Sequence, residues 1–331
     1  MERFALAAAV VLGFALTAAL CSLFVPLRRV LERREQQQQP VQSEQPRPAP
    51  LRAPLWGGLC AAAGTVAAVG VGWLAACVGQ PELLGSEGRL MTRLLTALAG
   101  SLAFGAVGLA EDLARMRSPA ALGLRRDVRL LLEALAAAFV LLLLRAAGCL
   151  PRGLGVPGAG YVLLGSAVPF LWAVLMVALA ECARIAERDE GAVCGAAFVA
   201  MLALMMVEAG LGVSGLAVLP AALAGALVAL GLWAFPPARL GAGCCGSLLA
   251  AGAIGCIPLS LDMTSLTVPL ALPLWVAGGL LAAQLLCAKR TGKPLRCWVK
   301  KHKMSPETVF LCSFALSAVG YVLALALLRW C

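Results

Sequence analysis

Residues 236–261, PPARLGAGCCGSLLAAGAIGCIPLSL, run from a short polar segment into a long apolar one. Prolines and small residues lead to Gly246 and Ser247, where we expect a helix to begin. The apolar part is close to the roughly twenty residues that a helix needs to cross the hydrocarbon core of a bilayer. The segment has the small-residue character of a phosphate-binding loop, but it contains no carboxylate, and Cys244 and Cys245 lie at its centre. It therefore predicts a membrane-spanning helix with an unusual start.

The composition of the whole chain indicates a membrane protein. Of its 331 residues 61% are hydrophobic and 13% are charged, and the mean hydropathy is +0.91. A soluble protein of this length carries far more polar surface. The formal net charge is +10, but Lys and Arg gather in short segments between apolar runs, which favours membrane orientation over nucleic-acid binding. The 13 cysteines include no CxxC pair and lie mainly in apolar runs, so we expect free, packed thiols.

Apolar runs of spanning length predict an all-α polytopic membrane protein with ten transmembrane helices. The predicted spans are 4–24, 55–77, 93–110, 128–147, 160–182, 191–209, 213–235, 243–261, 267–288 and 308–328. With the N-terminus outside, five cytosolic loops follow, at 25–54, 111–129, 183–190, 236–242 and 289–307. These loops hold 21 of the 27 Lys and Arg residues, in agreement with the positive-inside rule. We expect one integral domain in the cell (plasma) membrane, with a disordered Gln- and Pro-rich linker at 30–53.

The polar residues that could carry chemistry fall mostly in the predicted cytosolic segments. Glu111 and Asp112 close the third span, and Glu187 follows the fifth. The sole histidine, His302, lies in a basic loop near the C-terminal span. Carboxylates beside Lys and Arg suit an anionic, phosphorylated substrate. Each segment also has a plainer explanation, such as a solvated helix end, a surface ion pair or a loop attracted to anionic lipid headgroups.

Five motifs occur in order along nearly the whole chain. They are PLWGG (54–58), GLAEDLARMRS with LGLRRDVRLLLEAL (108–118 and 122–135), ECARIAERDEGAV (181–193), PARLGAGCCGSL (237–248) and GKPLRCWVKKH (292–302). In this order they resemble the motifs of the polyprenyl-phosphate N-acetylhexosamine-1-phosphate transferases, most closely the phospho-N-acetylmuramoyl-pentapeptide transferase (MraY) branch. The resemblance implies a ten-helix enzyme that moves phospho-MurNAc-pentapeptide, or a related phospho-sugar, from a UDP donor to undecaprenyl phosphate. It also implies release of UMP and assistance by Mg²⁺.

The resemblance assigns roles to residues of this chain. Those expected to be catalytic are Asp112, Glu111 and His302. Those expected to contact substrate or phosphate are Arg115, Arg129, Gly246, Ser247, Lys300 and Lys301. Those expected to bind the metal are Glu187 and Glu190. The expected ligands are therefore Mg²⁺, a UDP-sugar, undecaprenyl phosphate and anionic lipid headgroups, and a homodimer is left open.

The chain departs from the family pattern at the catalytic positions. Cys244 stands where the family places an Mg²⁺-binding aspartate, and a soft thiol is a poor ligand for this hard, oxygen-seeking ion. Glu111, Glu187 and Glu190 replace aspartates, and the chain contains no Asn. Three hypotheses therefore remain: an active transferase, a non-catalytic paralogue that binds polyprenyl phosphate or a cell-envelope partner, and a transporter or flippase. For the third, the clearest intramembrane carboxylate is Glu133, which we expect to make a helix–helix polar contact.

Overall fold

The protein is described by a computed structural model. The described residues are 2–38, 56–79, 88–117, 123–151, 153–156, 160–163, 165, 167–187, 192–213, 215–235, 239–280 and 306–330. Among the predicted site residues, Glu190, Lys300, Lys301 and His302 lie outside this part of the chain.

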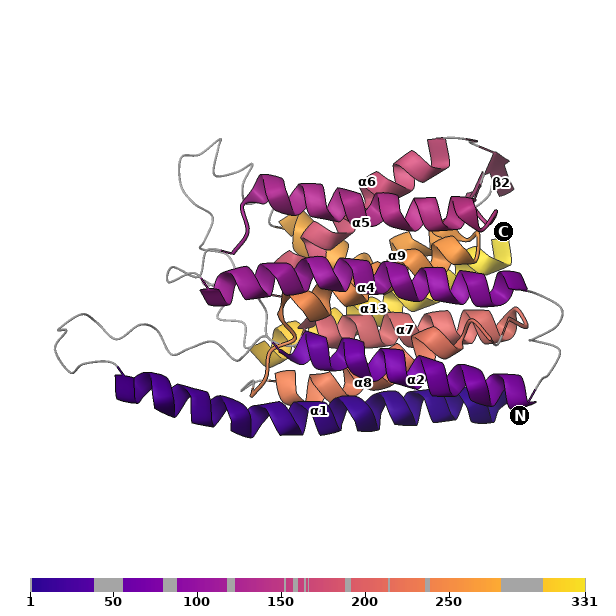
Figure 1. Cartoon of the computed structure of the whole chain (residues 1–331). Coiled ribbons are helices and arrows are strands. Elements are labelled where there is room, and N and C mark those ends of the chain that lie inside the picture. Colours follow the sequence, from indigo (N-terminus) through magenta and orange to yellow (C-terminus); the bar gives the residue numbers. More distant parts are fainter. Residues whose placement is uncertain are drawn as a thin grey trace.

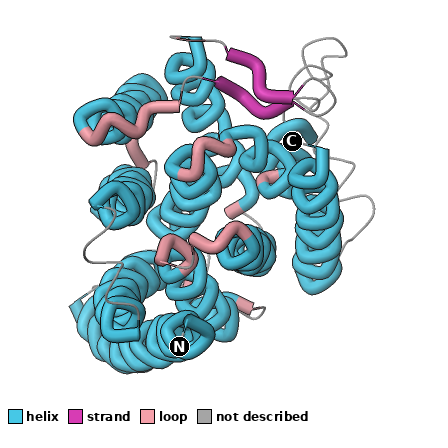
Figure 2. The backbone as a smooth tube through the Cα atoms, turned by 90° about the vertical axis from the view of Figure 1, so that its right-hand side faces the viewer, coloured by secondary structure: helices cyan, strands magenta, loops and turns pink. Residues whose placement is uncertain are grey.

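The described residues form a bundle of long helices that run side by side along one axis (Figure 1). Figure 2 shows the same bundle seen along the helix axes. The helices are α1 (Glu2–Gln38), α2 (Gly57–Gly79), α4 (Gly88–Arg117), α5 (Arg126–Ala146), α6 (Ala167–Ala186), α7 (Ala192–Gly210), α8 (Val218–Ala234), α9 (Gly243–Ser260), α10 (Thr267–Leu270) and α13 (Pro306–Trp330), with a short 3₁₀ turn η1 (Thr264–Leu266). Both ends of the chain lie at the same end of the bundle (Figure 1).

Helix α9 forms the centre of the bundle. All 18 of its residues are buried, and it packs against α2, α4, α6 and α7. Its sequence is rich in Gly, Ala and Cys, and such small side chains let neighbouring helices approach closely in a membrane. The stretch 243–261 is therefore a helix, as predicted, and it is the one around which the others are arranged.

Seven of the described helices are long and apolar enough to cross a membrane, which supports an all-α polytopic membrane protein. They are α1, α2, α4, α6, α7, α9 and α13. Helix α8 is apolar but has 17 residues, and α5 carries charged residues at Arg126, Asp127, Arg129, Glu133 and Arg145. The number of ten spans and their orientation remain predictions.

A β-hairpin interrupts the all-helical pattern. Strand β1 (Gly153–Val156) pairs antiparallel with strand β2 (Gly160–Leu163), with Gly153 opposite Leu163. The predicted span 160–182 was therefore wrong at its start, because residues 160–163 are in a strand and α6 begins at Ala167. The glycines around Pro157 disfavour a helix there, whereas Tyr161 and Val162 favour a strand.

Three further boundaries differ from the prediction. Helix α1 continues to Gln38 through strong helix formers, so the first nine residues of the predicted linker at 30–53 are helical, and 39–53 lie outside the described residues. Helix α4 continues to Arg117, which places Glu111 and Asp112 on a helix and not in a loop. The predicted span 267–288 is broken at Ala271, two residues before Pro273, and helix resumes over 272–280.

Candidate functional site

The site is built around the first turn of α9, which α2 and α4 hold closely from two sides. A Cβ atom on Gly108 of α4 would lie 2.2 Å from the carbonyl oxygen of Cys244, and one on Gly58 of α2 would lie 2.1 Å from the nitrogen of Gly246. Only glycine allows such approaches between backbones. The N–H of Gly57 also donates a hydrogen bond of 3.2 Å to the carbonyl oxygen of Gly241. The PLWGG motif thus packs against the loop that leads into α9.

Asp112 caps α9 from the neighbouring helix α4. Its Oδ1 accepts a hydrogen bond of 3.1 Å from the N–H of Cys244, and its Oδ2 accepts one of 2.9 Å from the N–H of Cys245. The first N–H groups of a helix have no partner within the helix and carry a partial positive charge. A carboxylate that is 1% exposed satisfies two of them here. Asp112 therefore fixes α4 to the start of α9.

Glu187, which follows α6, provides a second carboxylate at the same helix end. It accepts a hydrogen bond from the N–H of Gly243, whose positive φ of 68° favours glycine. Burial raises the pKa of Glu187 well above its ordinary value, the charge of Asp112 raises it further, and the Gly243 hydrogen bond opposes both. Three successive N–H groups of α9, at 243, 244 and 245, thus face carboxylates from two other elements.

An alternating series of ion pairs extends from this cap across α4, α5 and α6. Arg115 contacts Glu111 at 2.5 Å and Asp112 at 3.9 Å. Arg129 of α5 lies 3.7 Å from the same Glu111 oxygen and 2.8 Å from Glu181 of α6. The second oxygen of Glu181 is 2.5 Å from Arg184. Each arginine therefore has a carboxylate partner, and each of these pairs is at least partly buried.

Two buried carboxylates have side-chain oxygens with no hydrogen-bond partner among the described residues. Glu133 is 0% exposed, and neither of its oxygens has a hydrogen-bond partner among the described residues. The helix–helix polar contact that the sequence predicted for Glu133 is therefore not found as a hydrogen bond in this part of the chain. Glu208 of α7 is 1% exposed, and its Oε2 has no described partner. We did not single out Glu208 in the sequence, although a carboxylate inside an apolar run is a signal that could have found it.

The structure brings together most of the predicted site residues that it describes. Glu111, Asp112, Arg115 and Arg129 are linked by ion pairs, and Asp112 joins them to α9. Within α9, the Ser247 hydroxyl is buried and donates to the Cys244 carbonyl oxygen at 3.1 Å, so it serves the helix itself. Sequence reasoning missed Glu181 as the shared partner of two arginines, because its contact with Arg129 depends on how α5 and α6 pack.

The described residues do not fit a divalent metal. Both oxygens of Asp112 accept hydrogen bonds from backbone N–H groups, and Cys244 offers a thiol. Mg²⁺ prefers near-octahedral oxygen ligands at short distances. Within the described part of the chain, no group of three or more His, Cys, Asp or Glu side chains is placed to hold a metal ion. Glu187 is described but Glu190 is not, so the predicted pair of metal ligands cannot be assembled from these residues.

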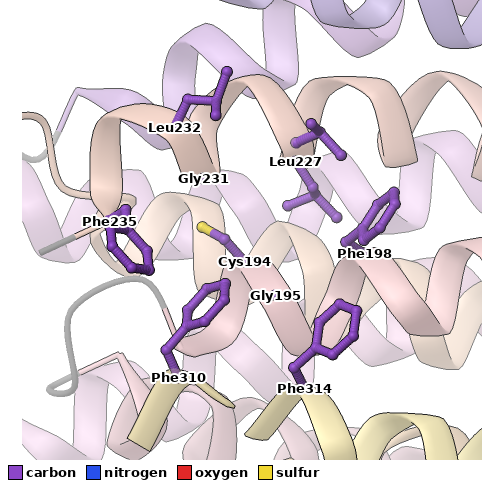
Figure 3. A pocket seen from close by; sticks show the side chains of 10 residues that line it. Cys194, Gly195, Phe198, Leu227, Gly231, Leu232, Phe235, Phe310 and Phe314 are labelled. Atoms are coloured by element: carbon purple, nitrogen blue, oxygen red, sulfur yellow. The ribbon is translucent and has the colours of Figure 1, made fainter. Parts of the chain in front are cut away.

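An apolar groove lies beside the site, between α7, α8 and α13 (Figure 3). Its volume is about 350 Å³. Phe310 and Phe235 meet edge to face with ring centroids 5.4 Å apart, and the absence of a side chain on Gly195 leaves room for the Phe310 ring. Cys194 lies in the groove and is close enough to Glu187 for their charges to interact, so the groove begins next to the cap of α9.

Comparison with known proteins places this cluster within one family. No curated protein matches the chain significantly. The family model for glycosyl transferase family 4 matches residues 94–262, which is just over half of the 331 residues. The matched region runs from α4 to the end of α9 and contains the cap and the ion pairs described above. The chain therefore belongs to glycosyl transferase family 4.

Proposed function

We propose that the protein is an MraY-like phosphoglycosyl transferase, which moves phospho-MurNAc-pentapeptide or a related phospho-sugar from a UDP donor to undecaprenyl phosphate. One observation carries this proposal. The acidic end of α4, the basic start of α5, the end of α6 and the first turn of α9 meet at one place, and the family match spans all four.

The reaction can be written for the residues that are present. An oxygen of the lipid phosphate attacks the phosphorus next to the sugar, a new P–O–P linkage forms, and the bond to UMP breaks so that UMP leaves. Arg115 and Arg129 would bind the phosphates, because a guanidinium offers several N–H donors to an anion. Helix N-termini also bind phosphate, so the substrate would compete with Asp112 for the N–H groups of Cys244 and Cys245.

A second candidate is a non-catalytic paralogue that binds polyprenyl phosphate or a cell-envelope partner. The observation that favours it is the occupation of the α9 start by Asp112 and Glu187, together with a cysteine at position 244. A side chain that serves as a helix cap is not free to act on a substrate unless these hydrogen bonds break. The arginines could still bind a lipid phosphate from their present positions.

We also propose that the site faces the cytosol and that the protein resides in the plasma membrane. The positive-inside pattern supports this orientation. The basic segment with Lys300 and Lys301 would then contact anionic lipid headgroups.

Release of UMP tests the proposed function directly. The full chain, purified in lipid nanodiscs, would be given UDP-MurNAc-pentapeptide and undecaprenyl phosphate, with and without Mg²⁺. Release of UMP that Asp112→Asn abolishes supports the transferase. If no UMP is released but the protein binds undecaprenyl phosphate, and Arg129→Gln weakens this binding, the result supports the non-catalytic paralogue. If the protein neither releases UMP nor binds undecaprenyl phosphate, both the transferase and a paralogue that binds polyprenyl phosphate are refuted.

A further inference from the structure

Helices α1 and α2 pack against each other along a seam of small residues. A Cβ atom on Gly64 would lie 2.2 Å from the Thr17 hydroxyl, and one on Gly72 would lie 3.0 Å from the Cβ of Ala9. Ala9 is eight residues before Thr17 on α1, and its partner Gly72 is eight residues after Gly64 on α2. This is the register of a regular antiparallel helix pair. The seam includes Ala9, Thr17 and Cys21 on α1 and Cys60, Gly64 and Gly72 on α2.

This register places two cysteines opposite each other at one end of the seam. Cys21 is one turn beyond Thr17, and Cys60 is one turn before Gly64. Their side chains are close enough to interact with each other, and both cysteines are free. Disulfides need Cα atoms roughly 4.4–6.8 Å apart, and helices that meet through Gly, Ala and Thr approach closely enough to allow this.

The position of the pair decides which oxidants can reach it. Cys21 and Cys60 are 0% and 2% exposed, so neither a water-soluble nor a lipid-soluble oxidant reaches the thiols until α1 and α2 separate locally. Cys21 lies near the end of the apolar segment Phe4–Phe24, and Cys60 lies near the start of the apolar segment Gly57–Val78. Both therefore lie at the same edge of the apolar layer. A lipid-soluble oxidant with a polar head would concentrate there.

We propose that Cys21 and Cys60 are a redox-active pair that a lipid-soluble quinone oxidises to an intramolecular disulfide. The two thiols give up two protons and two electrons, an S–S bond forms, and the quinone becomes a quinol. The bond would tie α1 to the start of α2. Because Gly57 and Gly58 pack against the loop and first turn of α9, the cross-link would also restrain the helix start that Asp112 caps.

Cleavage between the two helices makes the cross-link visible. A protease site would be inserted within residues 39–53 of the full chain, and the protein in nanodiscs would be treated with a short-chain ubiquinone analogue and then cut. The N-terminal fragment contains one cysteine, Cys21. We expect this fragment to remain attached to the rest of the chain on a gel without reductant and to separate after reduction. A wild-type fragment that separates without reductant, even with excess quinone, would overturn the proposal.

Two variants identify the partner of Cys21. Cys60→Ala should abolish the attachment, whereas Cys194→Ala should leave it unchanged, although Cys194 is the other thiol whose charge would interact with Cys21. Attachment that survives Cys60→Ala, or that disappears in Cys194→Ala, contradicts the assignment. Mass spectrometry of the wild-type protein needs no variant: the linked peptides containing residues 21 and 60 should weigh two hydrogens less than the reduced pair.

Discussion

The hydrogen bonds of Asp112 to the start of α9 predict a specific cost for the change Asp112→Asn. The carboxylate accepts from the N–H groups of both Cys244 and Cys245. Asparagine has one acceptor oxygen, and its amide nitrogen would meet the other N–H, so one buried donor loses its partner. The change also removes a negative charge from the positive end of a helix and from the neighbourhood of Arg115.

The expected loss follows from these contacts. An unsatisfied buried donor costs about 1–3 kcal/mol, and loss of a helix cap costs about 0.5–2 kcal/mol. Because the two effects overlap, we expect a total of about 2–4 kcal/mol. This corresponds to a fall in melting temperature of roughly 3–6 °C for a chain of this size.

Hydrogen exchange and melting temperature together test this prediction. Amide exchange followed by mass spectrometry should show faster exchange in the peptide that begins α9, because two of its N–H groups depend on Asp112. Asp127→Asn is the matched control, since Asp127 is exposed at the start of α5 and undergoes the same chemical change. If Asp112→Asn leaves exchange and melting temperature no different from Asp127→Asn, then Asp112 does not hold the start of α9.

Three further predictions concern charge and topology. The pKa of Glu187 is raised in the folded state, so the folded protein binds this proton more tightly than the unfolded chain does, and wild-type stability should fall as pH rises above about 4.5. Melting temperatures measured between about pH 5 and pH 8 should fall less steeply in Glu187→Gln than in the wild type, and equal slopes would contradict this prediction. With the other cysteines removed, an impermeant thiol reagent should label Cys149 from outside intact cells and Cys297 only from the cytosolic side; labelling of both from one side would rule out the ten-span topology. Without Mg²⁺, the melting temperature of Cys244→Asp should be lower than that of the wild type, and added Mg²⁺ should raise it. If Mg²⁺ raises the melting temperature of the wild type by as much, the wild-type protein already binds the metal.

The sequence predicted the helices well because their length and apolar character are local properties. Runs such as 191–209 and 243–261 coincide with α7 and α9 to within a residue. The prediction failed at 160–163, where an apolar run is short enough to be either a strand or the start of a helix. It also missed the continuation of α1 to Gln38, since a polar helix beyond a membrane span has no apolar pattern to reveal it.

The sequence indicated several residues of the candidate site, but it did not indicate how they contact one another. Motif order identified Glu111, Asp112 and Arg115 as residues that belong with the start of α9. Nothing in the sequence shows that Asp112 accepts hydrogen bonds from that helix, because such a contact depends on how α4 and α9 cross. The contact of Glu181 with Arg129 was hidden for the same reason, since the two residues lie on different helices, whereas Arg184 is three residues further along α6 itself.

The cap of α9 gives a physical reason for the cysteine at position 244. The Cys244 side chain lies among Asp112, Glu111 and Glu187, with Arg115 as the nearby cation. An aspartate there would add a further negative charge to a buried group of carboxylates, and without a bound cation this repulsion would oppose folding. A neutral thiol avoids the repulsion, while the Cys244 backbone still donates its N–H to Asp112. The departure of Cys244 from the family pattern and the capping by Asp112 are thus consistent with one another, because a neutral thiol suits a helix start whose N–H groups already face carboxylates.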